Sequence, residues 1–311
     1  MAPILPRMQV FEIADQDWFP QFLRSYMQAA LTAAWTTYIP ILQSSSPARI
    51  VAHLLSRQLG HSIHNYTFID FCAGGGGPTP SIEKHLNAAI KSSLPDPASS
   101  SGANYAAAAT APPPIQFVLT DLHPHTELWS AAAAASPNLS YVKESVDASN
   151  VSPDLIKDHK KQGKKVFRLF NLAFHHFDDT LARQILKNTL ETSDGFGIFE
   201  LQDRSLAGFL ACCLFGLGTM IMAPWYAFVW GTPLALVWTY LIPALPAVLV
   251  FDGWMSSLRT RTPGEIKGLL GSCGAPEGEV RKWEVKSGRE RFIPGVGYVN
   301  WVIVTKKPSQ E

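Results

Sequence analysis

The segment Tyr66–Pro78, with the sequence YTFIDFCAGGGGP, decides the fold of this chain. It opens with a short apolar run that contains one acidic residue, Asp70, and it closes with four consecutive glycines, Gly74 to Gly77. An apolar run that ends at glycine is typical of a buried parallel strand, and glycine lets the backbone turn tightly and approach a ligand closely because no Cβ is in the way. A helix expected from about Ser81 to Ile90 would direct its N-terminal amides at that ligand. The segment therefore predicts a nucleotide-type binding turn.

The composition limits the classes of protein to which the chain can belong. Its 311 residues suit one large domain, or one domain with additions. The net charge of +1 gives no general attraction to nucleic acid, so we expect no nucleic-acid partner. The four cysteines form no CxxC pair, so neither a metal site nor a secreted disulfide framework is expected. The N-terminus lacks the apolar core and cleavage site of a signal peptide, and the expected location is the cytosolic side of the cell.

Strand and helix patterns alternate through the middle of the chain. The predicted strands lie at 66–72, 115–120, 140–142, 166–171 and 196–201, and the predicted helices at 80–91, 125–135, 152–161 and 179–191. Such alternation is typical of an α/β domain with a largely parallel sheet. Residues 92–114 are rich in alanine, serine and proline, and they predict a surface loop that interrupts this pattern.

The two ends of the chain add further elements. These are predicted helices at 18–35, 47–59 and 263–271, and predicted strands at 279–286 and 297–306. Ser46 is a suitable N-cap for the second helix, and Thr262 and Glu265 form a capping box for the third. The last two strands predict an antiparallel hairpin added to the sheet. The expected organisation is a helical cap at 1–60, a core at 61–204, an apolar insert at 205–251 and the remainder of the core at 252–311.

Read from Asp70, the glycine loop has the pattern Asp-x-Cys-x-Gly-x-Gly. This pattern resembles the first motif of the class I S-adenosylmethionine-dependent methyltransferases, with Cys72 at a position where glycine is commoner. Later segments resemble further motifs of that family in the family's order, namely Thr120–Leu122, Ser145–Ala148 and Phe170–Phe177. With the C-terminal hairpin, the resemblance covers roughly residues 60–205 and 255–307. It implies a seven-stranded, mostly parallel Rossmann-like sheet with an antiparallel C-terminal hairpin.

The same resemblance implies S-adenosylmethionine as the cofactor and assigns its binding residues by position. They are Asp70, Cys72, Ala73, Gly74, Gly76, Asp121, Leu122, Asp147, Ala148, Asn171 and Leu172. S-adenosylmethionine has no phosphate, which agrees with a glycine loop that contains no Lys or Arg. Backbone amides suit its carboxylate, the Asp70 carboxylate suits its ammonium, and Asp121 suits the ribose hydroxyls. Asp147 either contacts the adenine or caps its own turn.

Methyl transfer requires the protein to align the acceptor with the methyl group and to exclude water. A base is needed only when the acceptor arrives protonated. His175 and His176 are the candidate catalytic bases, because histidine titrates near neutral pH; alternatively, they close the cofactor pocket through backbone hydrogen bonds. Asp178 and Asp179 are expected to cap the helix that follows, and Glu200 either contacts the substrate or satisfies loop amides.

The segment Ser205–Phe251 contains no Asp, Glu, Lys, Arg or His. Its two apolar stretches, Leu206–Met222 and Pro233–Phe251, are close to the roughly 20 residues that a membrane span needs, and aromatic residues between them favour a membrane interface. The segment forms a helical hairpin across a membrane, a shallow anchor in one leaflet, or an apolar lid in a soluble protein. Its prolines favour broken helices. Arginines on both sides indicate that its ends and the catalytic domain are cytosolic.

A hairpin insert after the fifth strand also resembles a group of bacterial and fungal class I methyltransferases. We therefore expect a membrane-associated methyltransferase whose acceptor is a small lipophilic molecule. The predicted helix with Trp18, Phe19, Phe22 and Tyr26 either lines the acceptor pocket or packs on the sheet. The alternatives are a non-catalytic S-adenosylmethionine-binding scaffold or sensor, and an NAD-linked oxidoreductase, against which the glycine loop and the terminal hairpin argue. The acceptor atom and the oligomeric state do not follow from the sequence.

Overall fold

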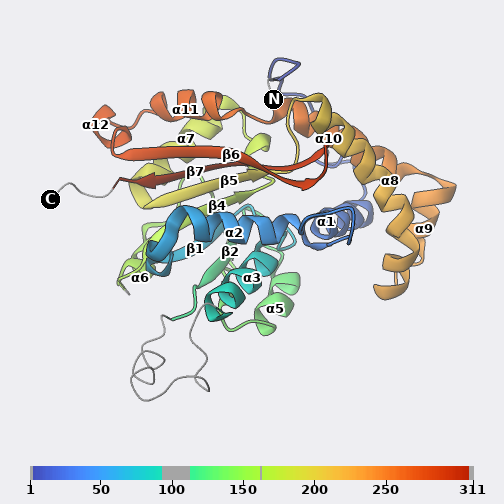
Figure 1. Ribbon diagram of the computed structural model, residues 1–311, viewed down its shortest axis with the longest axis horizontal. Coiled ribbons are helices and arrows are strands. Elements are labelled where there is room, and N and C mark those ends of the chain that lie inside the picture. The colour runs from blue at the N-terminus through green and yellow to red at the C-terminus, as the bar shows by residue number, and fades with distance from the viewer. Residues whose placement is uncertain (1–2, 93–112, 162, 308–311) are drawn as a thin grey trace.

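The computed structural model describes residues 3–92, 113–161 and 163–307 of the chain. Its centre is a seven-stranded sheet with the order β3-β2-β1-β4-β5-β7-β6 (Figure 1). The strands are β1 (Tyr66–Phe71), β2 (Phe117–Thr120), β3 (Leu139–Tyr141), β4 (Lys165–Asn171), β5 (Gly195–Glu200), β6 (Trp283–Ile293) and β7 (Gly297–Lys306). Neighbouring strands are parallel except at β7, which runs antiparallel to β5 and β6. The predicted sheet is confirmed, whereas most of the predicted loop at 92–114 lies outside the described residues.

The strand order reverses between β1 and β4, which are neighbours in the sheet although β2 and β3 lie between them in the sequence. In open α/β sheets, ligands bind outside the carboxyl ends of the strands at such a reversal. Asp70 lies near this end of β1, with Leu119 of β2 and Leu169 of β4 as its partners in register. The glycine loop thus emerges at the place where the topology favours a ligand.

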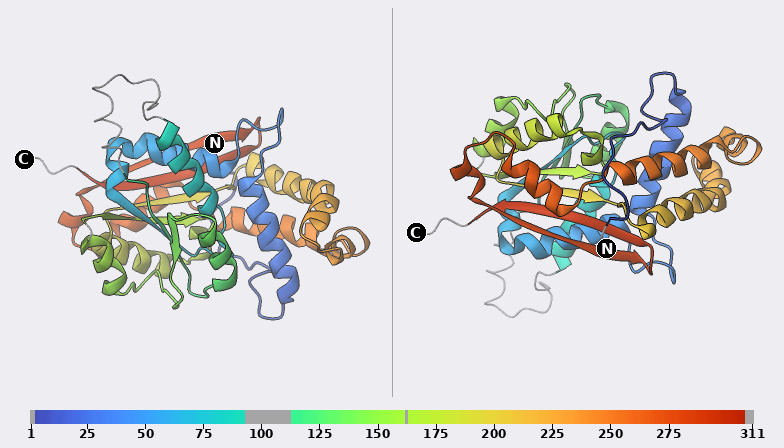
Figure 2. Two further views of the ribbon diagram at one scale, coloured as in Figure 1. Left: turned by 90° about the horizontal axis from the view of Figure 1, so that it is seen from below. Right: turned by 90° about the horizontal axis from the view of Figure 1, so that it is seen from above.

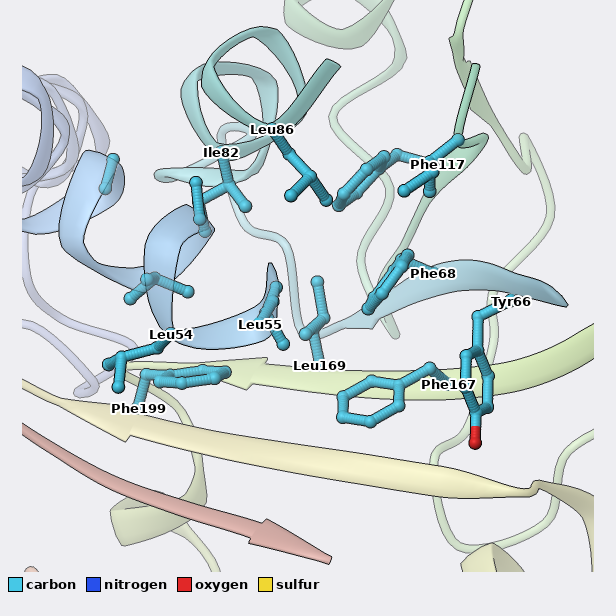
Figure 3. Close-up of a cluster of buried hydrophobic side chains, with 14 of the residues drawn as sticks. Leu54, Leu55, Tyr66, Phe68, Ile82, Leu86, Phe117, Phe167, Leu169 and Phe199 are labelled. Atoms are coloured by element: carbon cyan, nitrogen blue, oxygen red, sulfur yellow. The ribbon is translucent and has the colours of Figure 1, made fainter. Parts of the chain in front are cut away.

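Helices cover both faces of the sheet (Figures 1 and 2). One face carries α2 (Pro47–Leu59), α3 (Thr79–Ser92) and α5 (Thr126–Ala134), and the other carries α6 (Pro153–Lys161), α7 (Asp179–Thr192) and α11 (Pro263–Gly271). Figure 3 shows the apolar core on the face covered by α2, α3 and α5, where Phe68, Phe167 and Leu169 of the sheet pack near Leu55 and Leu86 of the helices. Because both faces are covered, β1 and β5 are buried at every residue. Two short 3-10 helices flank strands of this sheet. They are Gly60–Asn65, before β1, and Phe174–His176, after β4.

The N-terminal residues differ from the predicted helical cap. The helix α1 (Gln21–Thr36) begins only after Pro20, which has the extended conformation of an N-cap, and residues 3–19 form no helix. We call residues 3–20 the N-terminal strap. The strap is held by distant parts of the chain: the amide of Ile4 donates to the carbonyl of Arg204 at 2.8 Å, and the amide of Met8 donates to that of Leu258 at 3.1 Å. The predicted helix at 18–35 is present as α1, but long-range contacts rather than helix hold the residues before it.

The predicted strand at 279–286 begins too early. Residues Glu277–Val280 form a short helix, α12, and β6 starts at Trp283. Pro276 precedes this helix, and Glu277 and Glu279 lie in its first turn, where acidic side chains interact favourably with the helix dipole. The predicted capping box of α11 is present, with Thr262 and Glu265 bonded to each other's backbone amides.

The apolar insert forms a helical hairpin that projects sideways from the sheet (Figures 1 and 2). Its elements are α8 (Leu206–Val229), α9 (Leu234–Leu236), a π-helical turn (Val237–Leu241) and α10 (Ala244–Arg259). The first predicted stretch is longer than expected, because α8 continues through Pro224. The second is broken by a 70° bend before α10, as its prolines predicted. The expected boundary at residue 251 falls inside α10, so the insert is continuous with the rest of the core.

The hairpin leaves much of its apolar surface exposed. Among the described residues, 14 of the 26 exposed large apolar side chains lie on it. On α8 they form one stripe, Leu206, Leu210, Leu214, Leu217, Ile221, Trp225 and Phe228, at the spacing of a single helix face. By length and composition α8 can cross a membrane, and the bent pair Leu234–Leu241 with Ala244–Arg259 gives at most a second such helix. Only 28% of the most apolar window of α8 is buried, so α8 is not an ordinary core helix.

Candidate active site

The glycine loop after β1 turns through several left-handed residues. Gly74, Gly76 and Gly77 have φ values of 51°, 106° and 49°, which glycine adopts without the penalty that a Cβ imposes. Cys72 has a φ of 73°, an uncommon conformation for a residue with a side chain. Burial and the neighbouring carboxylate of Asp121 raise the pKa of the Cys72 thiol, so this cysteine is not an activated nucleophile. Turns of this kind direct backbone N–H groups at a common point, which suits a carboxylate.

Beneath the loop, Asp70 and Asn171 present acceptor atoms that lack partners. Asp70 Oδ2 accepts hydrogen bonds from the Thr79 hydroxyl and from Asn171 Nδ2, the latter at 3.3 Å. The other side-chain oxygens, Asp70 Oδ1 and Asn171 Oδ1, are buried and have no hydrogen-bond partner among the described residues. Burial, reinforced by the charge of Asp121, raises the pKa of Asp70 to about 7 despite the hydrogen bonds from Thr79 and Asn171. Two unpaired acceptors at the ends of β1 and β4 fit a cation such as an ammonium group.

Asp121, at the end of β2, is tied to the glycine loop. Its Oδ2 accepts a hydrogen bond from the amide of Gly74 at 2.8 Å, and its Oδ1 accepts one from the amide of His123 at 2.8 Å. A carboxylate offers about four lone-pair sites, so both oxygens can still accept hydrogen bonds from ribose hydroxyls. Leu122 beside it is 52% exposed, and Ala73 is buried.

Asp147 closes its own turn. Its Oδ1 accepts hydrogen bonds from the amide and the hydroxyl of Ser149 at 2.8 and 2.7 Å, as the alternative for this residue predicted. Ala148 is buried, and its carbonyl accepts a hydrogen bond at 3.0 Å from the guanidinium of Arg168. Arg168 is fully buried on β4, and this burial lowers its pKa to about 9. An arginine in the apolar run of β4 was a visible signal that the sequence analysis did not use.

The two candidate bases have different surroundings. After Leu172, which has a φ of 53°, the 3-10 turn Phe174–His176 carries both histidines. His175 is only 2% exposed, its Nδ1 lies 2.9 Å from Glu200 Oε2, and its amide donates to Glu200 Oε1 at 3.3 Å. If Nδ1 donates to this carboxylate, Nε2 is left as the free acceptor of a neutral imidazole. Nε2 lies 3.9 Å from Glu12 Oε1 and makes no hydrogen bond to a described residue.

His176 faces the N-terminal strap instead. Its side chain is 37% exposed, and its Nδ1 lies 3.3 Å from Asp15 Oδ2. Partial burial lowers the pKa of His176, but its hydrogen bond to Asp15 and the charge of Glu12 outweigh this effect, so the pKa is raised. Burial raises the pKa of Asp15, but the hydrogen bonds and positive charges of His176 and Arg259 overcome this effect and hold it at about 2. His176 and Asp15 therefore form an ion pair that fastens the strap.

Arg259 of α10 joins the strap to the histidines. Its Nη1 lies 2.9 Å from Glu12 Oε1, 3.1 Å from Asp15 Oδ2 and 3.3 Å from His176 Nδ1. Glu12, His175 and His176 are close enough to hold a metal ion, but the guanidinium already supplies the positive charge in this cluster. No local motif in the sequence marks Glu12, Asp15 and Arg259 as neighbours, because they lie up to 247 positions apart.

The order of the sheet identifies its fold. The reversed strand β7 between β5 and β6 is the feature that separates the class I methyltransferase fold from NAD-binding sheets. The chain has the class I methyltransferase fold. Of the two predicted caps of α7, Asp178 accepts a hydrogen bond from the amide of Leu181 at 2.8 Å, whereas Asp179 accepts one from the guanidinium of Arg261 at 2.8 Å. Glu200 satisfies a loop amide, that of His175.

Comparisons with known proteins give matches to solved structures alone. No protein-family model matches the chain, and the curated proteins give no match. A SAM-dependent methyltransferase from Anabaena variabilis is 14% identical, with 99% of both chains covered and a TM-score of 0.43. A protein described as a zinc-dependent alcohol dehydrogenase from Rhodobacter sphaeroides is 9% identical, with coverages of 91% and 98% and a TM-score of 0.42. The protein PigF with SAH is 10% identical, with coverages of 94% and 63% and a TM-score of 0.40. At these identities we base the functional assignment on the side chains of this chain.

Proposed function

We propose that this protein is an S-adenosylmethionine-dependent methyltransferase that associates with a membrane and methylates a small lipophilic acceptor. The observation that carries the proposal is the pair of unpaired acceptors, Asp70 Oδ1 and Asn171 Oδ1, beneath the glycine loop of this fold. Asp70 and Asn171 would hold the ammonium, the loop amides the carboxylate, and Asp121 the ribose. Leu122 and the Asp147–Ala148 turn would flank the adenine. When bound, the cofactor supplies a methyl group on a sulfonium, which needs no further activation.

His175 is the better candidate for the base. Glu200 fixes the Nδ1–H tautomer of His175 and stabilises the imidazolium that forms when Nε2 takes a proton from the acceptor. Gln202 lies 3.3 Å from both His175 Nδ1 and Glu200 Oε2 and restrains this pair. His176 is held by Asp15, so its role is to fasten the strap. Because His175 is almost fully buried, the strap both excludes water and has to shift when an acceptor enters.

The hairpin favours a shallow position in one leaflet. The helix α1 packs along it: Leu23 and Met27 join Leu245 and Leu249 in one buried cluster, and the rings of Phe22 and Trp238 are 5.5 Å apart. The helix α1 also carries polar side chains, Gln21, Arg24, Ser25 and Gln28. A full span would draw these into hydrocarbon at high cost, whereas a shallow position immerses only the exposed apolar stripe.

The lipophilic character proposed for the acceptor rests on the position of the hairpin relative to the proposed base. The hairpin starts directly after β5, and α10 ends at Arg259, which binds Glu12 at 2.9 Å. Glu12 in turn lies 3.9 Å from Nε2 of His175. An acceptor that partitions into the leaflet is therefore concentrated next to the proposed base. A sealed-vesicle assay tests the orientation: a thiol introduced by Thr232→Cys should be inaccessible to a membrane-impermeant maleimide from the far side. Labelling from that side would show a span, and a protein that stays in the supernatant without detergent would contradict membrane association.

Calorimetry tests the cofactor site. A bound ammonium favours the charged carboxylate, so binding of S-adenosylmethionine should lower the pKa of Asp70 and release protons near pH 7. Titrations in buffers of different ionisation enthalpy measure this release, and Asp70→Asn should abolish it. Asp178→Asn, at a helix cap, is the matched control. Incubation with methyl-labelled S-adenosylmethionine and lipid extracts then separates an enzyme from a scaffold, because a scaffold binds the cofactor but forms no S-adenosylhomocysteine.

A further inference from the structure

A cavity beside Glu200 has the features of a second ligand site. Its volume is about 240 Å³. The segment Glu200–Ser205 after β5, the Thr260–Pro263 connection between α10 and α11, and the outer strands β6 and β7 line it. The cavity is separate from the glycine loop, none of whose residues contributes to the lining.

Unpaired donors gather in this lining. Among the described residues, nine buried side-chain nitrogen or oxygen atoms have no hydrogen-bond partner. Three of the nine belong to residues that line the cavity: Nε of Arg261, Nε of Arg289 and Nε1 of Trp301. The side chain of Arg261 is only 1% exposed, and Trp301 is 7% exposed. All three are N–H donors, and a buried donor without an acceptor costs free energy, so the lining favours a ligand rich in acceptor oxygens.

The carboxylates in the lining are already occupied. Glu200 accepts hydrogen bonds from the backbone and ring of His175. Asp203 Oδ1 accepts hydrogen bonds from the amide and hydroxyl of Ser205, and Asp203 Oδ2 lies 3.6 Å from Arg289. Both carboxylates are therefore already hydrogen-bonded or ion-paired within the protein. The unpaired N–H groups therefore determine which ligand the cavity accepts.

Two helices begin at the cavity. Ser205 is the N-cap of α8 and Thr262 is the N-cap of α11, and both residues belong to the lining. The N-terminal ends of helices carry partial positive charge, which attracts anions. Arg204 adds a third guanidinium to those of Arg261 and Arg289. One terminal nitrogen of Arg204 pairs with Glu265 and one of Arg261 with Asp179, whereas Nε of Arg261 has no partner among the described residues. The helix ends and the unpaired donors are independent features, and both favour negative charge.

We propose that this cavity binds a phosphate group. The volume suits a phosphate with a short apolar attachment, because Ile198, Ile266 and Val302 form part of the lining. Such a group belongs either to a soluble phosphate ester or to the headgroup of an anionic phospholipid. Binding at Arg261 also bears on the proposed catalytic turn, because Arg261 donates hydrogen bonds to the carbonyls of Phe174 and Phe177 at 3.1 and 2.7 Å.

Calorimetric titration of the full chain with inorganic phosphate tests this site. We expect saturable binding with a Kd of roughly 1 mM or tighter. Arg289→Gln and Trp301→Phe should each weaken it about tenfold, because each removes a donor to a charged oxygen. Arg291→Gln on the same strand and Trp283→Phe, an indole that is 5% exposed, make the same changes outside the lining and should have no effect.

Arg289 is partly exposed, so Arg289→Gln keeps the test independent of core packing. The absence of saturable binding, or equal affinity in both cavity variants and the parent, would overturn the proposal. Vesicles of phosphatidylcholine with phosphatidic acid identify the source: displacement of phosphate by them, but not by pure phosphatidylcholine, indicates a lipid headgroup, and retained phosphate indicates a soluble ester. The titration needs no S-adenosylmethionine, so its outcome is independent of the proposed methyl transfer.

Discussion

Replacing Phe228 and Leu241 by serine should release the protein from membranes. Phe228 lies in the last turn of α8 and Leu241 ends the π-helical turn before α10, and they are 83% and 79% exposed. Complete burial of such a side chain stabilises by about 1.5–3 kcal/mol. Scaled by these exposed fractions, each side chain contributes about 2 kcal/mol when it enters the leaflet. The double variant should therefore lose about 4 kcal/mol, or about 10³-fold in its partition coefficient.

Flotation with phosphatidylcholine vesicles measures this partition coefficient for the full chain over a range of lipid concentrations. Leu128→Ser is the matched control, because Leu128 is 55% exposed but lies on α5, away from the hairpin. The control should float like the parent protein. If the double variant loses less than about threefold, or if the control loses as much, Phe228 and Leu241 do not contact lipid and the membrane proposal is wrong.

Three further predictions concern the site and the core. Glu200→Gln should lower the rate of methyl transfer to a hydroxyl acceptor by about 10²-fold with unchanged cofactor affinity, measured by single-turnover kinetics and calorimetry; equal rates would exclude His175 as the base. The pKa of His176 is raised in the folded protein. Its contribution to docking of the strap should therefore be complete below the unfolded pKa of about 6.5 and be lost as the pH rises through the folded pKa. Hydrogen exchange of residues 3–20 measures this loss, and His176→Gln should abolish the pH dependence. Gly195→Ala should destabilise the fold by about 1–3 kcal/mol, because its Cβ would lie 2.6 Å from the Phe167 ring, whereas Gly268→Ala on α11 meets nothing within 4 Å and should be neutral or stabilising in thermal unfolding.

Local signals in the sequence predicted most of the core. Pro47 after Ser46 and the Thr262–Glu265 box are chemical caps, and the structure has both helices where these caps lie. The reversed C-terminal strands followed from a run of alternating and apolar residues bounded by proline and glycine. Such features depend on neighbours within a few positions, so a single sequence contains them.

The position of the strap and the cluster of charged residues around Arg259 could not be predicted from such local signals. The contacts of Glu12 and Asp15 with Arg259 join residues 247 and 244 positions apart. In sequence, these residues are isolated charges, and nothing nearby distinguishes them from solvated surface residues. The separate roles of His175 and His176 have the same origin, because only the fold decides which of two adjacent imidazoles meets Glu200 and which meets Asp15.

The helix α10 connects the two parts of the proposed function. Near its start, Leu245 and Leu249 pack against α1 in the apolar cluster of the hairpin. Near its end, Ser256 and Arg259 bind Glu12 of the strap, beside His175. A helix of 16 residues spans about 24 Å, so a displacement of the hairpin would also move the residues that fasten the strap. If the hairpin lies in a leaflet as proposed, the insert after β5 would link its position there to the cover over the proposed base, which is the arrangement that the proposed lipophilic acceptor would require.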